Sequence, residues 1–293
     1  MESEVLVEKQ AMGYSPDSEN GLDPPGPLSE DPNFMVRGRF SRACTWRLGL
    51  VYQLILREFR VQYGETWLGP LWGIVPPVIL VVLYEFVLTR VLHVSTPAHG
   101  SFLLAGLIPW LAFSAGAVRG GNSLVANLPL LKSYKIPPWT FPTAAAISAL
   151  PGPFLVILPF VARKALSGSG LRQLSGLVPL IILLAIFIIG TGIWFGLLSV
   201  LLPDFQNGLP SALRLLFFMT PVLYPLSSVP HPYDLVMGMN PLAHYIEAFR
   251  TCLLDSDLPQ SGEFLLLSTT AMIILISGIY VTESMRARLA EMA

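Results

Sequence analysis

The residues with the most distinctive chemistry interrupt one apolar stretch, residues 214–250. Prolines at 221 and 225 remove helical hydrogen bonds, so the backbone near Tyr224 is expected to bend at low cost. In hydrocarbon such backbone is stable only where protein buries it or where it lines a water-filled cavity. A new helix is predicted to start at Asn240-Pro241, an N-cap followed by proline. We interpret the stretch as a movable gate whose candidate residues are Pro221, Pro225, Asn240, Pro241, Glu247 and Arg250.

A second group of residues is suited to a path for a substrate made of sugar rings. Aromatic faces stack on such rings without a fixed hydrogen-bond pattern, although core packing is the more usual role of any single aromatic side chain. Glu85 lies well inside an apolar segment, where an ionisable residue is costly and indicates function by default. A protonated or hydrogen-bonded structural role is equally compatible with its position. The candidates for this path are Trp72, Tyr84, Glu85, Trp110, Phe113, Phe217, Tyr224 and Tyr245.

No pattern in the chain indicates covalent chemistry. Paired carboxylates, a Ser/His/Asp arrangement and zinc-ligand spacing are absent, and the four histidines are scattered. The motif GxxxxGK[ST], whose backbone cradles nucleotide phosphates, is absent as well. We therefore expect no catalytic residue, no metal site and no cofactor in this chain.

Composition places these residues in a membrane. Of the 293 residues, 53% are hydrophobic and 13% are charged, whereas charged residues make up about a quarter of an average soluble domain. The net charge of −1 argues against nucleic acid as a partner, because nucleic acid requires a basic surface.

Six apolar segments approach the roughly 20 residues that a helix needs to cross a bilayer. They cover residues 71–92, 102–125, 141–162, 177–202, 209–226 and 264–282. Lys and Arg are concentrated in the ends and loops that an ends-inside arrangement places in the cytoplasm. Arg119 and Arg214 fall near the inner ends of their segments and are expected to reach the interface. The sequence thus predicts an all-α integral membrane protein with six transmembrane helices and cytoplasmic N- and C-termini.

The N-terminal part divides where the charge changes. Residues 1–35 are acidic and rich in proline, which predicts a disordered tail. Residues 36–66 form a basic region in which one helical stripe is apolar; the stripe consists of Leu48, Val51, Tyr52, Ile55 and Phe59. This pattern is typical of an amphipathic interfacial helix lying along the membrane surface, with packing on protein as the alternative. Residues 67–293 then form the six-span domain.

The loop from Asn122 to Pro142 combines apolar and basic residues on the side predicted to be cytoplasmic. Such a segment is a plausible docking surface for a soluble partner, and an ordinary re-entry elbow is the alternative.

Four segments resemble polysaccharide-export permeases of the ABC type-2 family, which move O-antigen, teichoic acid or capsular chains. They are REFRVQYGETWLGPLWGIVPP at 57–77, the loop at 122–142, FMTPVLYP at 218–225 and MNPLAHYIEAFR at 239–250. The resemblance implies a homodimer with a channel at its interface and a short re-entrant helical hairpin between spans five and six. It also implies contacts with a separate cytoplasmic ATPase, for which the candidates are Arg57, Arg60, Asn122, Lys132, Tyr134 and Lys135.

The resemblance further implies a transporter subunit rather than an enzyme. It would export an undecaprenyl-linked polysaccharide across the bacterial cytoplasmic (inner) membrane, with membrane lipid around it. ATP and magnesium would be bound by the partner ATPase. The alternatives are an ABC type-2 exporter of a small lipid or drug, and a membrane glycosyl or acyl transferase. One departure is the segment PDFQN at 203–207, which lacks the arginine of the Tyr-Arg-Asp-like signature common in these permeases.

Overall fold

The computed structural model describes residues 49–64, 67, 69–91, 99–133, 136–166, 170–255 and 259–292. All regular elements in these ranges are helices. The predicted acidic tail, residues 1–35, lies outside the described residues, as do residues 36–48 of the predicted amphipathic region. A compact unit begins at Gly49 and contains all of the described helices.

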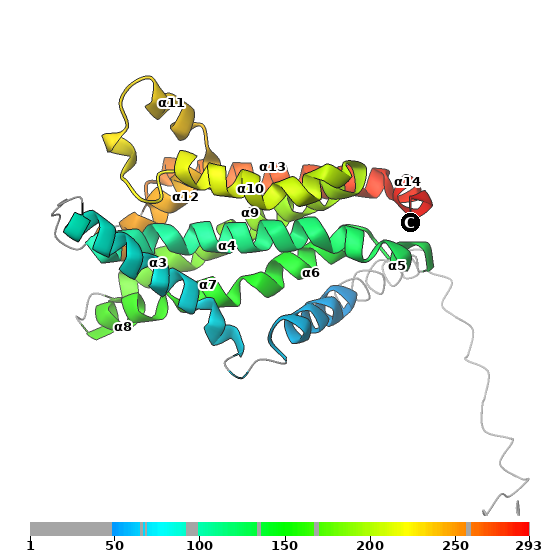
Figure 1. Cartoon of the computed structure of the whole chain (residues 1–293), viewed down its shortest axis with the longest axis horizontal. Helices are drawn as coiled ribbons and strands as arrows, with labels where there is room; N and C mark the ends of the chain where they lie inside the picture. Colours follow the sequence, from blue (N-terminus) through cyan, green and yellow to red (C-terminus); the bar gives the residue numbers. More distant parts are fainter. Residues whose placement is uncertain are drawn as a thin grey trace, which may run out of the picture. The chain divides into compact units, whose positions relative to one another are not determined.

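Three helices are long and apolar enough to cross a membrane. They are α4 (His99–Ala126), α9 (Gly170–Leu201) and α13 (Ser261–Ser284), and they coincide with the second, fourth and sixth predicted segments. α9 packs against both α4 and α13, as Figure 1 shows. The core of the domain lies largely between these helices.

α4 and α9 approach each other closely because glycines face one another. A Cβ atom added to Gly120 would lie 2.7 Å from the Cα of Gly192, which is shorter than van der Waals contact. Small residues of this kind allow helix backbones to pack directly in membrane proteins. The register between the two long helices therefore depends on the absence of a side chain at Gly120.

The third predicted segment, 141–162, is divided into three short helices. They are α6 (Thr140–Ala149), α7 (Pro151–Leu155) and α8 (Leu158–Leu166). Prolines cause the divisions, since Pro151 begins α7 and Pro159 lies in the first turn of α8. α6 packs on α4 and α9, which supports the backbone where it is broken.

The first and fifth predicted segments have different boundaries in the structure. The first begins with a short 3₁₀ helix, η2 (Gly69–Gly73), followed by α3 (Val75–Phe86) and a π-helical turn, η3 (Val87–Val91). The fifth is α10 (Pro203–Met219), so it begins six residues before the predicted 209 and ends seven before 226. Thr220 ends it in an extended conformation (φ −105°, ψ 136°), because the residue before a proline disfavours the helical region.

Short helices connect α10 to α13. They are η4 (Leu226–Ser228), α11 (Tyr233–Gly238), α12 (Pro241–Arg250) and the π-helical turn η5 (Thr251–Asp255). α12 packs against α4, α9 and α13, whereas α11 stands away from the long helices in Figure 1.

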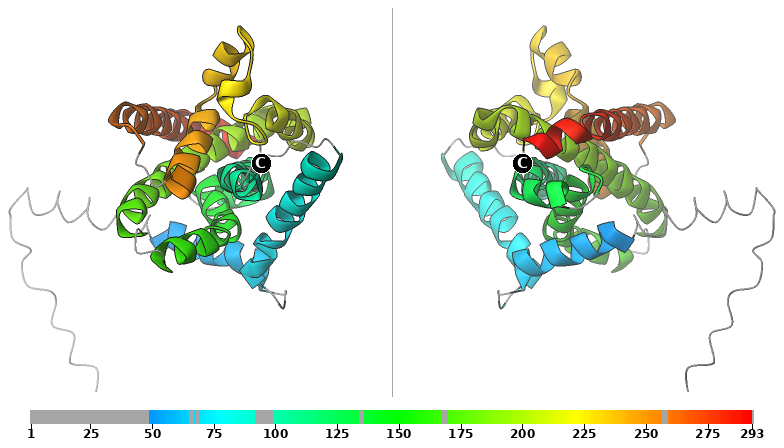
Figure 2. Two further views of the ribbon diagram at one scale, coloured as in Figure 1. Left: turned by 90° about the vertical axis from the view of Figure 1, so that its left-hand side faces the viewer. Right: turned by 90° about the vertical axis from the view of Figure 1, so that its right-hand side faces the viewer.

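A separate cluster of short elements gathers near the other end of α4. It contains the helix at 49–63, α5 (Leu128–Ser133) and α14 (Arg286–Glu291). Leu54, Leu131 and Leu289, one from each element, are buried together there. Figure 2 shows the helix at 49–63 in blue running across α6 and α7. Tyr52, in the predicted apolar stripe, is exposed, and Leu54, outside that stripe, is buried on protein.

Replacing Gly120 with alanine is expected to lower the unfolding free energy of the full-length chain in detergent by about 1–3 kcal/mol, since the new methyl group overlaps α9. Gly208→Ala is the matched control, because its Cβ meets nothing within 4 Å. That helical substitution is expected to stabilise the protein by about 0.4–1 kcal/mol. Thermal unfolding measures both effects, and equal shifts would contradict the proposed close contact.

Candidate functional site

The site is built around the start of α12, where the sequence predicted a helix cap. Asn240 Oδ1 accepts a hydrogen bond from the backbone N–H of Leu242 at 3.0 Å, and Pro241 is the first helical residue. The prediction that a helix starts at Asn240-Pro241 is confirmed. The Asn240 side chain also donates to Thr220 Oγ1 at 2.9 Å, which joins the start of α12 to the end of α10.

Arg250, at the end of α12, holds the interrupted backbone that follows α10. Its side chain is 3% exposed. Nη2 donates to the carbonyl of Val222 at 2.6 Å, and Nη1 donates to the carbonyl of Tyr224 at 3.3 Å and to Glu247 Oε1 at 3.0 Å. The guanidinium carbon lies 3.7 Å from the ring centroid of Phe102 on α4.

These contacts stabilise both the freed carbonyls and the buried charge, while the Nε of Arg250 has no hydrogen-bond partner among the described residues. Backbone carbonyls without partners are expensive in hydrocarbon, and so is a buried guanidinium without hydrogen bonds or a counter-charge. Arg250 and Glu247 supply partners for the backbone at 222–226, because Glu247 Oε1 also accepts the N–H of Leu226 at 3.4 Å. Gly106 leaves the space, since a Cβ atom there would lie 2.8 Å from Arg250 Nη2. We name this arrangement the arginine clamp.

The clamp changes one expectation drawn from the sequence. Carbonyls released by the prolines were expected to let the backbone near Tyr224 bend at low cost. Those of Val222 and Tyr224 are instead tied to Arg250, so bending there requires these bonds to break. The six gate candidates are brought together around the clamp, and their function as a gate stays a prediction.

Three path candidates meet in a groove between α3, α4 and α10. Tyr84 and Phe217 have ring centroids 6.3 Å apart, and Trp110 lies 5.3 Å from Phe217 in an edge-to-face arrangement. The groove holds about 410 Å³, and we name it the aromatic groove. Its lining residues are Tyr84, Trp110, Ser114, Val118, Pro210, Leu213, Arg214, Phe217 and Phe218.

The other path candidates lie elsewhere. Phe113 is buried behind the groove, with its ring centroid 5.8 Å from that of Phe187. Trp72 is exposed on η2, and Tyr224 lies beside the clamp with its hydroxyl donating to the carbonyl of Phe218 at 2.9 Å. The side chain of Glu85 lies outside the described residues.

Tyr245 conflicts with its predicted role as a substrate contact. Its side chain is fully buried, and its hydroxyl lies 3.2 Å from the carbonyl oxygen of Leu183 and 3.1 Å from that of Leu267. It therefore joins α9 to α13 inside one chain and leaves no surface for a passing molecule.

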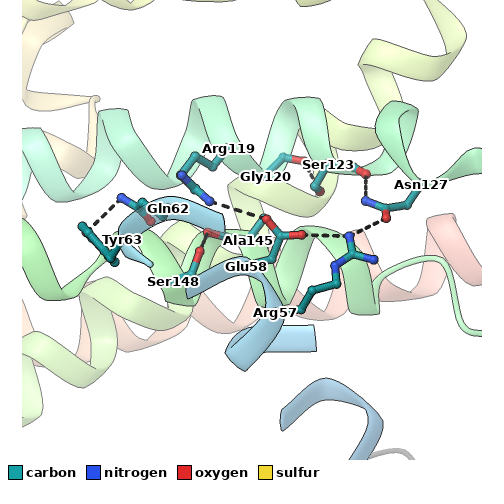
Figure 3. A network of polar contacts seen from close by, with 10 residues as sticks. All are labelled: Arg57, Glu58, Gln62, Tyr63, Arg119, Gly120, Ser123, Asn127, Ala145 and Ser148. Carbon is teal, nitrogen blue, oxygen red and sulfur yellow. Dashed lines mark hydrogen bonds and ion pairs between the residues drawn. The ribbon is translucent and has the colours of Figure 1, made fainter. Parts of the chain in front are cut away.

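A polar network that the sequence did not reveal joins the helix at 49–63 to α4 (Figure 3). Glu58 accepts from Arg57 at 3.0 Å and from Arg119 at 3.5 Å, while Arg57 also donates to Asn127 Oδ1 at 2.7 Å. Asn127 in turn donates to the carbonyl of Ser123 at 2.7 Å. Glu58 was the only acid in a run of arginines, and that isolation was the available signal.

Tyr63 ends this helix close to the same network. Its side chain is buried, and Gln62 Nε2 donates to its hydroxyl at 2.8 Å. Burial raises the pKa of Tyr63, against the opposing positive charge of Arg119. The hydroxyl therefore stays neutral at physiological pH.

The predicted ATPase contacts do not form one continuous set. Arg57 is engaged in the network, Arg60 is exposed, and Asn122 is half-buried. Tyr134 and Lys135 lie outside the described residues. Lys132 lines a second groove, of about 620 Å³, between α5 and α14; its lining is Leu131, Lys132, Ser133, Ile136, Arg286, Ala287 and Ala290.

These features together define the class of protein. Long apolar helices surround buried polar contacts, a groove presents aromatic rings, and no group of three His, Cys, Asp or Glu side chains within the described ranges is placed to hold a metal ion. This is a helical multi-pass membrane domain. The chain belongs to the ABC-2 type transporter family, whose model matches residues 49–254.

Several relatives align over most of their own length. The O-antigen export system permease protein RfbA of Myxococcus xanthus is 26% identical over 83% of this chain and 95% of that protein. A Klebsiella pneumoniae protein of the same name is 28% identical over 84% and 97%. The polysialic acid transport protein KpsM of Escherichia coli is 28% identical over 78% and 90%.

Arg250→Gln is expected to lower the unfolding free energy by about 2–5 kcal/mol, because it leaves buried backbone carbonyls without their donor. Thermal unfolding of the full-length chain in detergent is the measurement. Arg286→Gln serves as the control, since that arginine is about one-third exposed and so is its partner Glu283, at 3.1 Å. It is expected to cost less than about 1 kcal/mol. A loss of equal size in both variants would show that the carbonyl contacts are not what Arg250 contributes.

Proposed function

We propose that this chain is the permease subunit of an ATP-driven exporter that moves an undecaprenyl-linked polysaccharide across the bacterial cytoplasmic membrane. One observation carries the proposal: several relatives named for O-antigen or polysialic acid transport align over 90–97% of their length. The aromatic groove supports it, because rings on a membrane helix can contact sugars without fixed hydrogen bonds. The relatives' names favour a polysaccharide over a small lipid or drug, and over the chemistry of a transferase.

The proposed topology has six spans. Each span would consist of one helix or of a group of consecutive helices. In chain order, the six are α3 with η3, then α4, then α6 to α8 together, then α9, α10 and α13. The helix at 49–63, α5 and α14 would lie at the cytoplasmic face, with both termini. α11 and α12 would form the re-entrant hairpin at the outer face. The positions of Phe102 and Asn127 support this, because they place the clamp and the polar network at opposite ends of α4.

We place a second copy of the chain against α3 and α10. Both helices expose large apolar side chains beside the aromatic groove; these are Val78, Ile79, Val82, Leu83, Phe86, Leu215, Phe218 and Met219. A two-fold dimer would bring two grooves to face each other and enclose a path between them. The exported chain would then pass Tyr84, Trp110 and Phe217 from both copies.

ATP hydrolysis would come from a separate ATPase that binds ATP and magnesium. The groove between α5 and α14 is the docking site that we propose, with Lys132 and Arg286 as its basic residues. Arg286 is partly neutralised by Glu283 at 3.1 Å, whereas Lys132 is exposed. The polar network would pass movement of the bound ATPase to α4.

Deleting the gene is expected to remove a surface polysaccharide, and returning the full-length chain is expected to restore it. Loss of the glycan is measured on whole cells with a lectin or antiserum. Unchanged surface glycan in the deletion strain would overturn the proposal.

The purified chain alone is expected to hydrolyse no ATP, because it has no phosphate-binding loop.

The topology predicts that Ser133 and Ser227 lie on opposite sides of the membrane. Both are exposed, the first at the end of α5 and the second in η4. With Cys44 and Cys252 replaced by alanine, Ser133→Cys is expected to react with a membrane-impermeant maleimide only after cells are opened, and to crosslink to the ATPase. Ser227→Cys is expected to react in intact cells. Labelling of Ser133→Cys in intact cells would contradict the topology.

A further inference from the structure

The aromatic groove contains two polar side chains that no other described residue engages. Arg214 is exposed and Ser114 is half-buried, and both line the groove. In the part of the chain that the structure describes, neither side chain makes a hydrogen bond or an ion pair. Ser123, on the same helix as Ser114, behaves differently, because it donates to the carbonyl of Gly120 at 2.8 Å. Two unengaged donors therefore share one cavity.

The proposed topology sets the depth of these two donors in the membrane. Ser114 is close to the midpoint of the candidate span Gly100–Ala126. Arg214 follows the start of α10 by eleven residues, which is about 16 Å at a rise of about 1.5 Å per residue. The first residues of α10, PDFQN, are mostly polar, so the earlier start of the helix leaves Arg214 near the inner end of its apolar part.

The chemistry of the groove indicates what these donors bind. An arginine in a groove between membrane helices is costly unless something compensates its charge. Its planar guanidinium matches a phosphate group in bidentate geometry and stays protonated. The rings of Tyr84 and Trp110 lie in the same groove, where they would meet the sugar next to such a phosphate. Apolar side chains exposed around it, such as Leu215 and Phe218, suit a lipid tail.

We propose that Arg214 and Ser114 bind the phosphate group that links the exported glycan to its lipid carrier, inside the aromatic groove. This inference rests on the proposed function, since it takes the carrier-linked glycan as the substrate. Arg214 would hold the phosphate, Ser114 would donate to it, and the adjacent rings would contact the first sugar. A phospholipid headgroup carries the same phosphate chemistry, so the test must separate the two sources.

The binding test uses the full-length chain in nanodiscs of neutral lipid. The probe is a radiolabelled polyprenyl diphosphate-linked N-acetylglucosamine. Arg214→Gln is expected to weaken its binding about 10- to 100-fold, as for the loss of a charge-assisted hydrogen bond. The affinity of Arg214→Lys for the probe is expected to lie between those of the unaltered chain and Arg214→Gln, because lysine keeps the charge without the bidentate geometry. Arg90→Gln is the control. Arg90 is an exposed arginine on η3 that does not line the groove, so this variant is expected to bind the probe as the unaltered chain does.

Two further ligands identify the source of the phosphate. The same polyprenyl chain and sugar joined without phosphate is expected to bind weakly, and equally to the unaltered chain and to Arg214→Gln. Phosphatidylglycerol is expected to displace the probe only at large excess. Equal displacement would show a headgroup site and would overturn the assignment to the carrier-linked glycan. Unchanged binding of the probe by Arg214→Gln would overturn the site itself.

Export by cells separates this inference from the proposed function. In the deletion strain, the unaltered chain and Arg90→Gln are expected to restore surface glycan, and Arg214→Gln is expected to restore much less at equal membrane abundance. Full restoration by Arg214→Gln, with normal probe binding, would overturn the phosphate site and leave the exporter intact. If deletion leaves the surface glycan unchanged, the proposed function itself fails.

Discussion

The hydrogen bonds from Arg250 to the carbonyls of Val222 and Tyr224 are the contacts on which the arrangement of α10, α12 and the beginning of α4 depends. Backbone that leaves a helix inside a membrane protein must find partners within the protein. Pro221 forces that departure by holding Thr220 extended. The guanidinium supplies several donors from one point, Phe102 covers it, and Gly106 makes room for it. A lysine offers only a point charge and could not reproduce the planar geometry.

α4 is the element that connects the three parts of the site. Its first turns contact the arginine clamp through Phe102 and Gly106, and its middle contributes Trp110 and Ser114 to the aromatic groove. Its last turns meet the helix at 49–63 through Arg119, and Asn127 follows directly after it. α4 is helical throughout, although Pro109 removes one of its hydrogen bonds between the clamp and the groove. The clamp, the groove and the network are therefore joined through one helix.

The helix at 49–63 packs on protein, which was one of the two alternatives that the sequence left open for the basic N-terminal region. Its buried residues, Leu54 and Tyr63, face protein, while Tyr52 and Arg60 are exposed. Glu58 has arginine partners on its own helix and on α4, so the helix is held by polar contacts as well as by apolar packing.

The sequence by itself determined features that depend on local chemistry. Proline and asparagine set the end of α10 and the start of α12, and runs of apolar residues set α4, α9 and α13, because backbone restriction and hydropathy act over a few residues. The family resemblance also came from short ordered segments. Only the tertiary structure decided that Tyr84, Trp110 and Phe217 meet, that Tyr245 is buried, and that Arg250 binds freed carbonyls. Those outcomes depend on how far each helix is rotated and shifted against its neighbours. In an apolar helix the pattern of residues specifies this weakly, since nearly every face is hydrophobic, and direct contacts such as that of Gly120 with Gly192 set it instead.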